Sequence, residues 1–146
     1  TNSTATFKLN TRNQISIVQK TTYPEGDKTE FIISVDRPEK FTLAFRIPQW
    51  SIKNSLLVNG EKIGRFASGS YAKITRKWKT GDKINLQLDL RGRIVKLNNN
   101  SALLRGPIVL ARDSRFNDGF VDEAISTQEK DGIVDLKIWN DKPKGI

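Results

Sequence analysis

The chain has 146 residues, of which 36% are hydrophobic and 28% charged, which is enough for one globular domain with a core of its own. It contains no His and no Cys, and this excludes imidazole-based triads, thiolate nucleophiles, disulfides and the usual zinc sites. The 25 basic against 16 acidic residues give a formal net charge of +9, which favours an anionic partner, although the basic residues are spread over nearly every segment, as on an ordinary solvated surface.

Predicted strands alternate with turns along the first half of the chain. Loop signals at 23–27 and 36–40 precede a strand at 41–47, whose apolar residues occupy every second position and should line a core. They are Phe41, Leu43, Phe45 and Ile47, and Pro48 ends the strand. An apolar run then leads into Asn59-Gly60, which predicts a two-residue type I′ hairpin because both residues tolerate a positive φ.

The clearest alternation lies at 84–90, after a predicted strand at 74–78 and a reversal at 80–82. Its inward residues are expected to be Ile84, Leu86, Leu88 and Leu90, and the outward ones Lys83, Asn85, Gln87 and Asp89. Trp78 shares the strand parity of Ile74, so its indole is expected in the core.

The last third of the chain has a different pattern. Segment 101–111 is apolar at consecutive positions, which predicts a single strand covered on both faces, with Val109 on the outer face as a contact residue. A long loop is expected at 112–130, with room for a short helix at 121–126, and alternation returns at 134–138. Antiparallel strands without helices to cover them pack most simply as two sheets face to face. The prediction is therefore an all-β fold, a two-sheet antiparallel β-sandwich forming a single domain over 1–146.

Carboxylates offer little support for catalysis. Two carboxylates suffice for glycoside hydrolysis, but the acidic pairs at 25/27, 122/123 and 131/135 lie in loops or at outward positions, where solvated acids are expected. Asp113, Asn117 and Asp118 lack the spacing of a known calcium loop and are expected to form turns. We therefore assign no catalytic residue, metal or cofactor to the chain.

Aromatic and basic side chains are the remaining candidates. A flat row of exposed rings could stack on sugars, and the rings concerned are Trp50, Tyr71 and Trp139; Trp50 could instead seal a sheet edge. Trp139 has the polar parity of its strand and is the ring expected to be most exposed. The densest basic group comprises Lys73, Arg76, Lys77, Lys79 and Lys83, and it would bind an anionic polymer if those side chains converged on one face.

Several short motifs follow one another in a fixed order. They are RIPQW at 46–50, VNG at 58–60, GSYAKITRKW at 69–78 with GD at 81–82, and RGP at 105–107. This series resembles the C-terminal β-sandwich region of the β-L-arabinofuranosidase-like glycoside hydrolases, family 127 and its relatives. The resemblance covers about 15–111.

The resemblance implies a division of labour within a longer, bacterial protein. In this family an upstream (α/α) barrel carries a Cys nucleophile, a carboxylate acid/base and a zinc ion held by Cys and Glu. Because this chain has no Cys, none of these roles transfers to it, and the resemblance implies a non-catalytic accessory domain whose partner is that barrel. The absence of Met also indicates a fragment.

Two other functions stay open at this point, a carbohydrate-binding module and an anionic-polymer-binding domain. Nucleic acid is not expected as a partner, because no arginine-rich arm or zinc-finger spacing accompanies the basic residues. No apolar run of membrane-spanning length and no signal peptide occur in the sequence as given. A hydrolase of this kind would favour a periplasmic or extracellular location.

Overall fold

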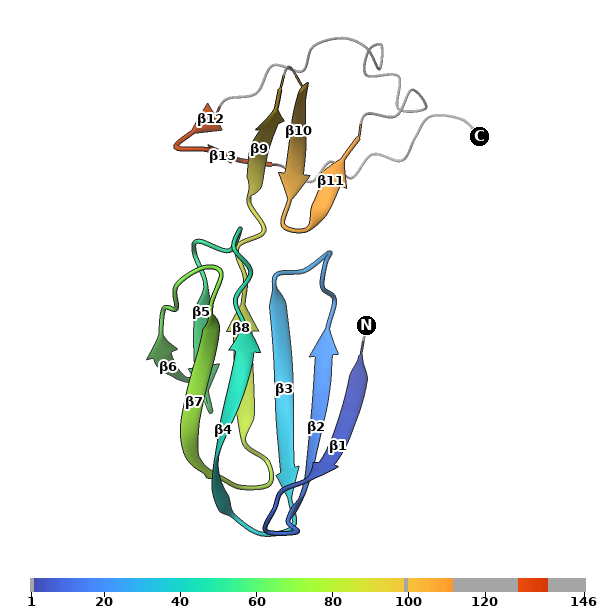
Figure 1. Cartoon of the computed structure of the whole chain (residues 1–146), viewed down its shortest axis with the longest axis vertical. Coiled ribbons are helices and arrows are strands. Elements are labelled where there is room, and N and C mark those ends of the chain that lie inside the picture. The colour runs from blue at the N-terminus through green and yellow to red at the C-terminus, as the bar shows by residue number, and fades with distance from the viewer. Residues whose placement is uncertain (1, 99, 112–128, 137–146) are drawn as a thin grey trace, which may run out of the picture. The chain divides into compact units, whose positions relative to one another are not determined.

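The computed structural model describes residues 2–98, 100–111 and 129–136. Within these ranges every regular element is a β-strand (Figure 1). This confirms the predicted all-β fold. The same ranges contain no helix that is long and apolar enough to cross a membrane. We expected a single domain, and the contacts divide the chain into two compact units, Thr1–Leu90 and Arg91–Ile146, which are described separately below.

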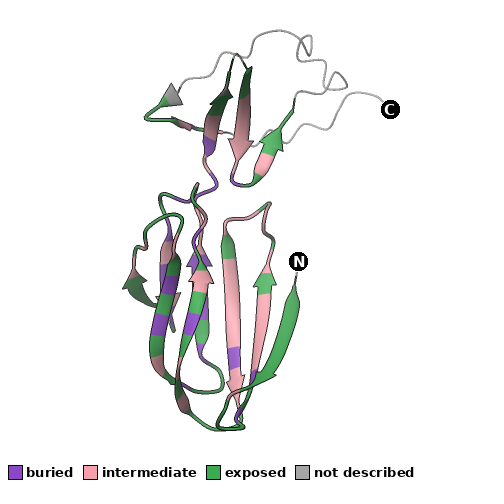
Figure 2. Ribbon diagram, in the orientation of Figure 1, coloured by how far each residue is buried: buried purple, intermediate pink, exposed green. Residues whose placement is uncertain are grey.

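The first unit contains eight strands in two antiparallel sheets. They are β1 (Ser3–Lys8), β2 (Gln14–Thr21), β3 (Lys28–Val35), β4 (Glu39–Arg46), β5 (Ser55–Val58), β6 (Glu61–Gly64), β7 (Tyr71–Trp78) and β8 (Lys83–Gln87). The larger sheet has the order β1-β2-β3-β8-β5-β6, and β4 pairs with β7 in the smaller one. Strand β1 is an edge of the larger sheet, and all six of its residues are exposed (Figure 2).

Both sheets of the first unit contribute side chains to one core. The larger sheet supplies Ile33, Leu56, Val58, Ile84 and Leu86, and the smaller one supplies Leu43, Ala72, Ile74 and Trp78. Trp78 is fully buried, and its indole Nε1 donates a hydrogen bond to the Phe41 carbonyl at 3.0 Å. The predicted core position of Trp78 is therefore confirmed, and the two sheets form a β-sandwich.

The two alternating strands of the prediction are found, with one correction. In β4, Leu43 is buried while Thr42 and Ala44 are exposed, as expected. The prediction that Asp89 faces solvent was wrong: β8 ends at Gln87, and Asp89 is buried. Its carboxylate accepts the Lys53 N–H at 3.0 Å, and its own N–H donates to the Ser51 hydroxyl at 2.9 Å, so a loop distant in sequence satisfies it.

The predicted turns are also found, but one of them connects different elements than expected. Asn59 and Gly60 have φ angles of 52° and 85°, as a type I′ hairpin between β5 and β6 requires. Gly81, with φ 92°, lies in the expected reversal at 80–82. This reversal does not make a hairpin, because β7 pairs with β4 and β8 pairs with β3 and β5. It carries the chain from one sheet to the other.

The second unit is a five-stranded sheet of order β11-β10-β9-β13-β12. Its strands are β9 (Gly92–Leu97), β10 (Asn100–Arg105), β11 (Ile108–Leu110), β12 (Glu129–Lys130) and β13 (Ile133–Val134). Gly92 is buried against β13, and a Cβ added to it would lie 2.6 Å from the Val134 carbonyl oxygen.

The prediction of one strand over 101–111 was wrong. The chain reverses at Gly106-Pro107, where Gly106 has φ 57°, and β10 and β11 form an antiparallel pair. Coverage on both faces is also not found within the described residues, because Val109 is 62% exposed and Leu110 is 37% exposed. In the predicted strand at 134–138, β13 ends at Val134 and residues 137–138 lie outside the described ranges, as do most of the 112–130 loop and the helix at 121–126.

Candidate functional site

The outward face of the small sheet carries a group of exposed basic side chains. Strands β4 and β7 are antiparallel, and the register fixes which side chains lie opposite each other on that face. The opposite pairs are Lys40 with Lys77, Thr42 with Thr75, Ala44 with Lys73, and Arg46 with Tyr71. All eight residues are exposed, four of them are basic and none is acidic.

The alternation of β7 explains why these residues point outward. Ala72, Ile74 and Trp78 are buried in the core, so the residues between them face solvent (Figure 2). Arg76 shares the inward parity, and its guanidinium carbon lies 5.3 Å from the centre of the Trp78 ring. Arg76 is therefore held on the core side and does not contribute charge to the outward face.

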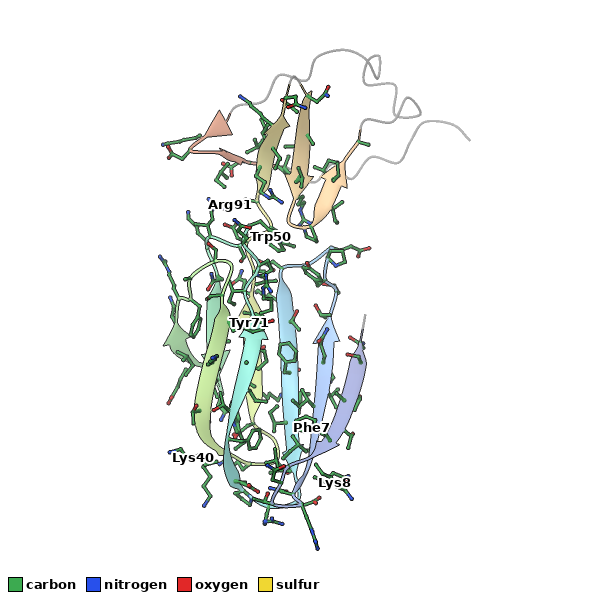
Figure 3. The ribbon with its side chains drawn as sticks, viewed as in Figure 1. Phe7, Lys8, Lys40, Trp50, Tyr71 and Arg91 are labelled. Carbon is green, nitrogen blue, oxygen red and sulfur yellow. The ribbon has the colours of Figure 1, made fainter. Side chains whose placement is uncertain are left out.

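The end of this face near Tyr71 combines a ring with a guanidinium. The Tyr71 side chain is 54% exposed, and the Arg46 guanidinium carbon lies 5.5 Å from the centre of its ring, within cation–π range. Farther along the sheet, the Thr42 and Thr75 hydroxyls share a hydrogen bond of 2.7 Å. Figure 3 labels Tyr71 toward one end of these two strands and Lys40 at the other.

Trp50 lies in a turn beside the start of β7. The Ser51 N–H donates to the Pro48 carbonyl at 3.0 Å and closes the turn, and the Ile47 N–H donates to the Ser70 carbonyl at 2.8 Å. These bonds bring the segments that carry Trp50 and Tyr71 close together. Trp50 itself is half-buried.

The candidate contact residues are therefore distributed over different parts of the chain. Trp50 and Tyr71 belong to the first unit, exposed Val109 belongs to the second, and Trp139 lies outside the described residues. Tyr71 is the exposed ring of the pair in the first unit.

The basic group at 73–83 does not converge on one face, as binding of an anionic polymer by that group would require. Lys73 and Lys77 lie on the outward face of β7, but Arg76 points inward and Lys83 lies on β8 in the other sheet. The partners that Lys73 and Lys77 do have on their face, Lys40 and Arg46, were missed. The alternation of 41–47 placed Arg46 outward, whereas Lys40 was assigned to the loop at 36–40 and lies on β4 in the structure. Only the register with β7 brings both side chains beside Lys73 and Lys77.

Several carboxylates of the first unit are engaged in structural hydrogen bonds. Glu39 accepts hydrogen bonds from the Thr11 hydroxyl at 2.7 Å and from the Asn13 amide at 2.9 Å, and these lower the pKa of Glu39, with Arg37 adding a smaller effect. Asp27 accepts the Gln87 side-chain amide at 2.6 Å. Within the ranges that the structure describes, no group of three acidic residues could hold a metal ion.

Two motifs that look like unrelated turns in the sequence are joined in the fold. The side-chain Nδ2 of Asn59 donates a hydrogen bond to the carboxylate of buried Asp82 at 2.9 Å. The side-chain Oδ1 of Asn59 accepts a hydrogen bond from the backbone N–H of Lys83 at 2.8 Å. The other carboxylate oxygen of Asp82 accepts the Lys79 N–H at 3.0 Å. The VNG turn and the GD turn are thus parts of one hydrogen-bonded network.

Comparisons with known proteins agree on the kind of domain. Residues 1–90 match the family described as "Beta-L-arabinofuranosidase, GH127 middle domain". No curated protein matches the chain.

Among solved structures, a glycoside hydrolase is 28% identical, with a TM-score of 0.69, over 74% of this chain and 19% of its own. A GH127 β-L-arabinofuranosidase from Geobacillus stearothermophilus T6 is 29% identical, with a TM-score of 0.68, over 74% and 18%. A further GH127 β-arabinofuranosidase is 28% identical, with a TM-score of 0.65, over 74% and 20%. The chain thus spans about a fifth of the length of these relatives.

Proposed function

The chain belongs to the GH127 β-L-arabinofuranosidase family, and we propose that it is a non-catalytic β-sandwich that supports a catalytic (α/α) barrel in the same protein. The observation that carries this proposal is the match of 1–90 to the middle domain of the family, which ends where the first compact unit ends. A chain that corresponds to about a fifth of the length of its relatives leaves most of the enzyme to other domains.

The chemistry of the described residues supports an accessory role. Because the chain has no Cys to act as a nucleophile, glycoside hydrolysis by it would need the common arrangement of two carboxyl groups that flank the substrate, one protonated and the other ionised. Glu39, Asp82 and Asp89 instead bind backbone and side-chain donors of the sandwich itself. Carboxylates used in this way hold turns and loops together.

We further propose that the barrel precedes the sandwich in the intact protein. The sandwich would then follow the barrel, as the motif series implied, and would still be the middle domain of the intact protein. Val109 is the contact residue that we assign to a neighbouring domain, because a large apolar side chain that is 62% exposed gains stability when a partner covers it.

The test is an activity assay of the purified 146-residue chain on an aryl β-L-arabinofuranoside. The GH127 enzyme from Geobacillus stearothermophilus serves as the positive control at equal molar concentration. We expect no turnover by the chain alone. Turnover that disappears in an Asp122→Asn or Glu123→Gln variant would show that the chain carries its own catalytic carboxylates and would overturn the accessory role.

A further inference from the structure

We propose that the outward face of β4 and β7 binds a carboxylated polysaccharide. The surface concerned, called the β4–β7 face below, consists of Lys40, Thr42, Ala44, Arg46, Tyr71, Lys73, Thr75 and Lys77. The choice of a polysaccharide as the anionic polymer rests on the proposed function, because it takes the chain to be part of an enzyme that acts on glycans.

The basic charges on this face have no acidic partner on the same face. None of its eight residues is acidic, and the one carboxylate on these two strands, Glu39, has the opposite strand parity and binds Thr11 and Asn13. Lys40 and Lys77 even lie directly opposite each other, an arrangement that costs stability because like charges repel across a strand pair. On the outward side of the larger sheet, by contrast, Lys20 lies opposite Glu30.

The spacing suits a linear ligand. Successive outward pairs are about 7 Å apart along a strand, so the line from Lys40 and Lys77 past Lys73 to Arg46 extends over roughly 20 Å. The face is only two strands wide, which is about 5 Å between their axes. A small anion could contact one or two of these cations, whereas a chain with repeated carboxylates laid along the strands could contact all four.

The side chains also match a carboxylated sugar in kind. The Arg46 guanidinium can donate two parallel hydrogen bonds to a carboxylate, and the lysines act as point charges that tolerate some variation in position. The Tyr71 ring, held beside Arg46, offers an apolar face for a sugar ring, and the Thr42 and Thr75 hydroxyls lie between the charged pairs. One exposed ring is less than the succession of stacked bases used by binders of single-stranded nucleic acid, so the face favours a glycan.

The experiment measures binding of the whole chain to polygalacturonate by isothermal titration calorimetry. The same polymer after full methyl esterification keeps the backbone but removes the charge. A variant with Lys40→Gln, Lys73→Gln and Lys77→Gln removes three charges from the β4–β7 face. The matched control variant carries Lys20→Gln, Lys62→Gln and Lys83→Gln, which removes three exposed charges from the larger sheet. Circular dichroism melts verify that both variants fold.

We expect polygalacturonate binding that weakens as salt is raised, and little binding of the esterified polymer. The β4–β7 variant should bind about tenfold more weakly than the unchanged chain, and the control variant should stay within about twofold. Equal losses in both variants would mean that overall charge is responsible, and tighter binding of duplex DNA would mean that the face suits nucleic acid.

Either of those results, or no binding of polygalacturonate at all, would overturn this inference. The proposed accessory role would be untouched, because it depends on the activity assay. Turnover by the chain alone would in turn overturn the accessory role without deciding whether the β4–β7 face binds a polyanion, so the two failures are distinguishable.

Discussion

Replacing Asn59 tests whether the bond between the two turns contributes to stability. Asn59→Ala removes the hydrogen bond to buried Asp82, a bond to a charged group that contributes about 1.5 to 3 kcal/mol. It also removes the bond from the Lys83 N–H, which contributes about 0.5 to 1 kcal/mol because water can replace it. Alanine at φ 52° adds roughly 1 kcal/mol of strain. We therefore expect the free energy of unfolding to fall by about 3 to 5 kcal/mol.

The matched control is Asn59→Gly, which removes the same two hydrogen bonds but adopts a positive φ without strain. The free energy of unfolding should fall by about 1 kcal/mol less in Asn59→Gly than in Asn59→Ala. Both losses are measured in urea melts followed by tryptophan fluorescence, because Trp78 is fully buried and reports on the core. A loss below about 1 kcal/mol for Asn59→Gly would refute the reasoning, since it would mean that the network contributes almost nothing.

Three further changes test other parts of the structure. Leu43→Ala should lower the free energy of unfolding by about 2 to 5 kcal/mol in urea melts, because it leaves a cavity in the core; a loss below about 1 kcal/mol would contradict this. Hydrogen bonds from Thr11 and Asn13 hold the pKa of Glu39 below its usual 4.5. These bonds therefore stabilise the fold fully above pH 4.5, and the stabilisation is lost as the pH falls through the lowered pKa. Glu39→Gln should therefore flatten the acid side of the stability profile, and identical profiles would contradict the assignment. Gly92→Ala should weaken the pairing of β9 with β13, because the new Cβ would meet a backbone oxygen at 2.6 Å; unchanged hydrogen exchange in β9 would count against this.

Features that depend on neighbouring residues were predictable from the sequence. The side-chain direction in β4 follows from alternation alone, because successive strand residues point to opposite faces. The Asn59-Gly60 turn follows from the ability of these two residues to adopt positive φ. The reversal at Gly106-Pro107 was missed although a Gly-Pro pair is itself a turn signal, because the apolar residues on both sides of it resembled one buried strand.

Features that depend on distant residues were not predictable. Asp89 is polar and has outward parity, and only the position of a loop some 36 residues earlier in the chain explains its burial. The β4–β7 face likewise needs the register between two strands that β5 and β6 separate in the chain. Parity assigns each side chain to a face, but it does not say which strand lies alongside.

The position of β8 in the larger sheet has a consequence for how the chain reaches its fold during synthesis. Strand β8 lies between β3 and β5, although it follows both in the chain. Until the ribosome has released residues 83–87, the nascent chain can form β1-β2-β3 and the β5-β6 hairpin only as separate pieces, each with an unpaired edge. We therefore expect chains that stop before β8 to aggregate. The strand of the sandwich that is synthesised last is also the one that joins the two parts of the larger sheet.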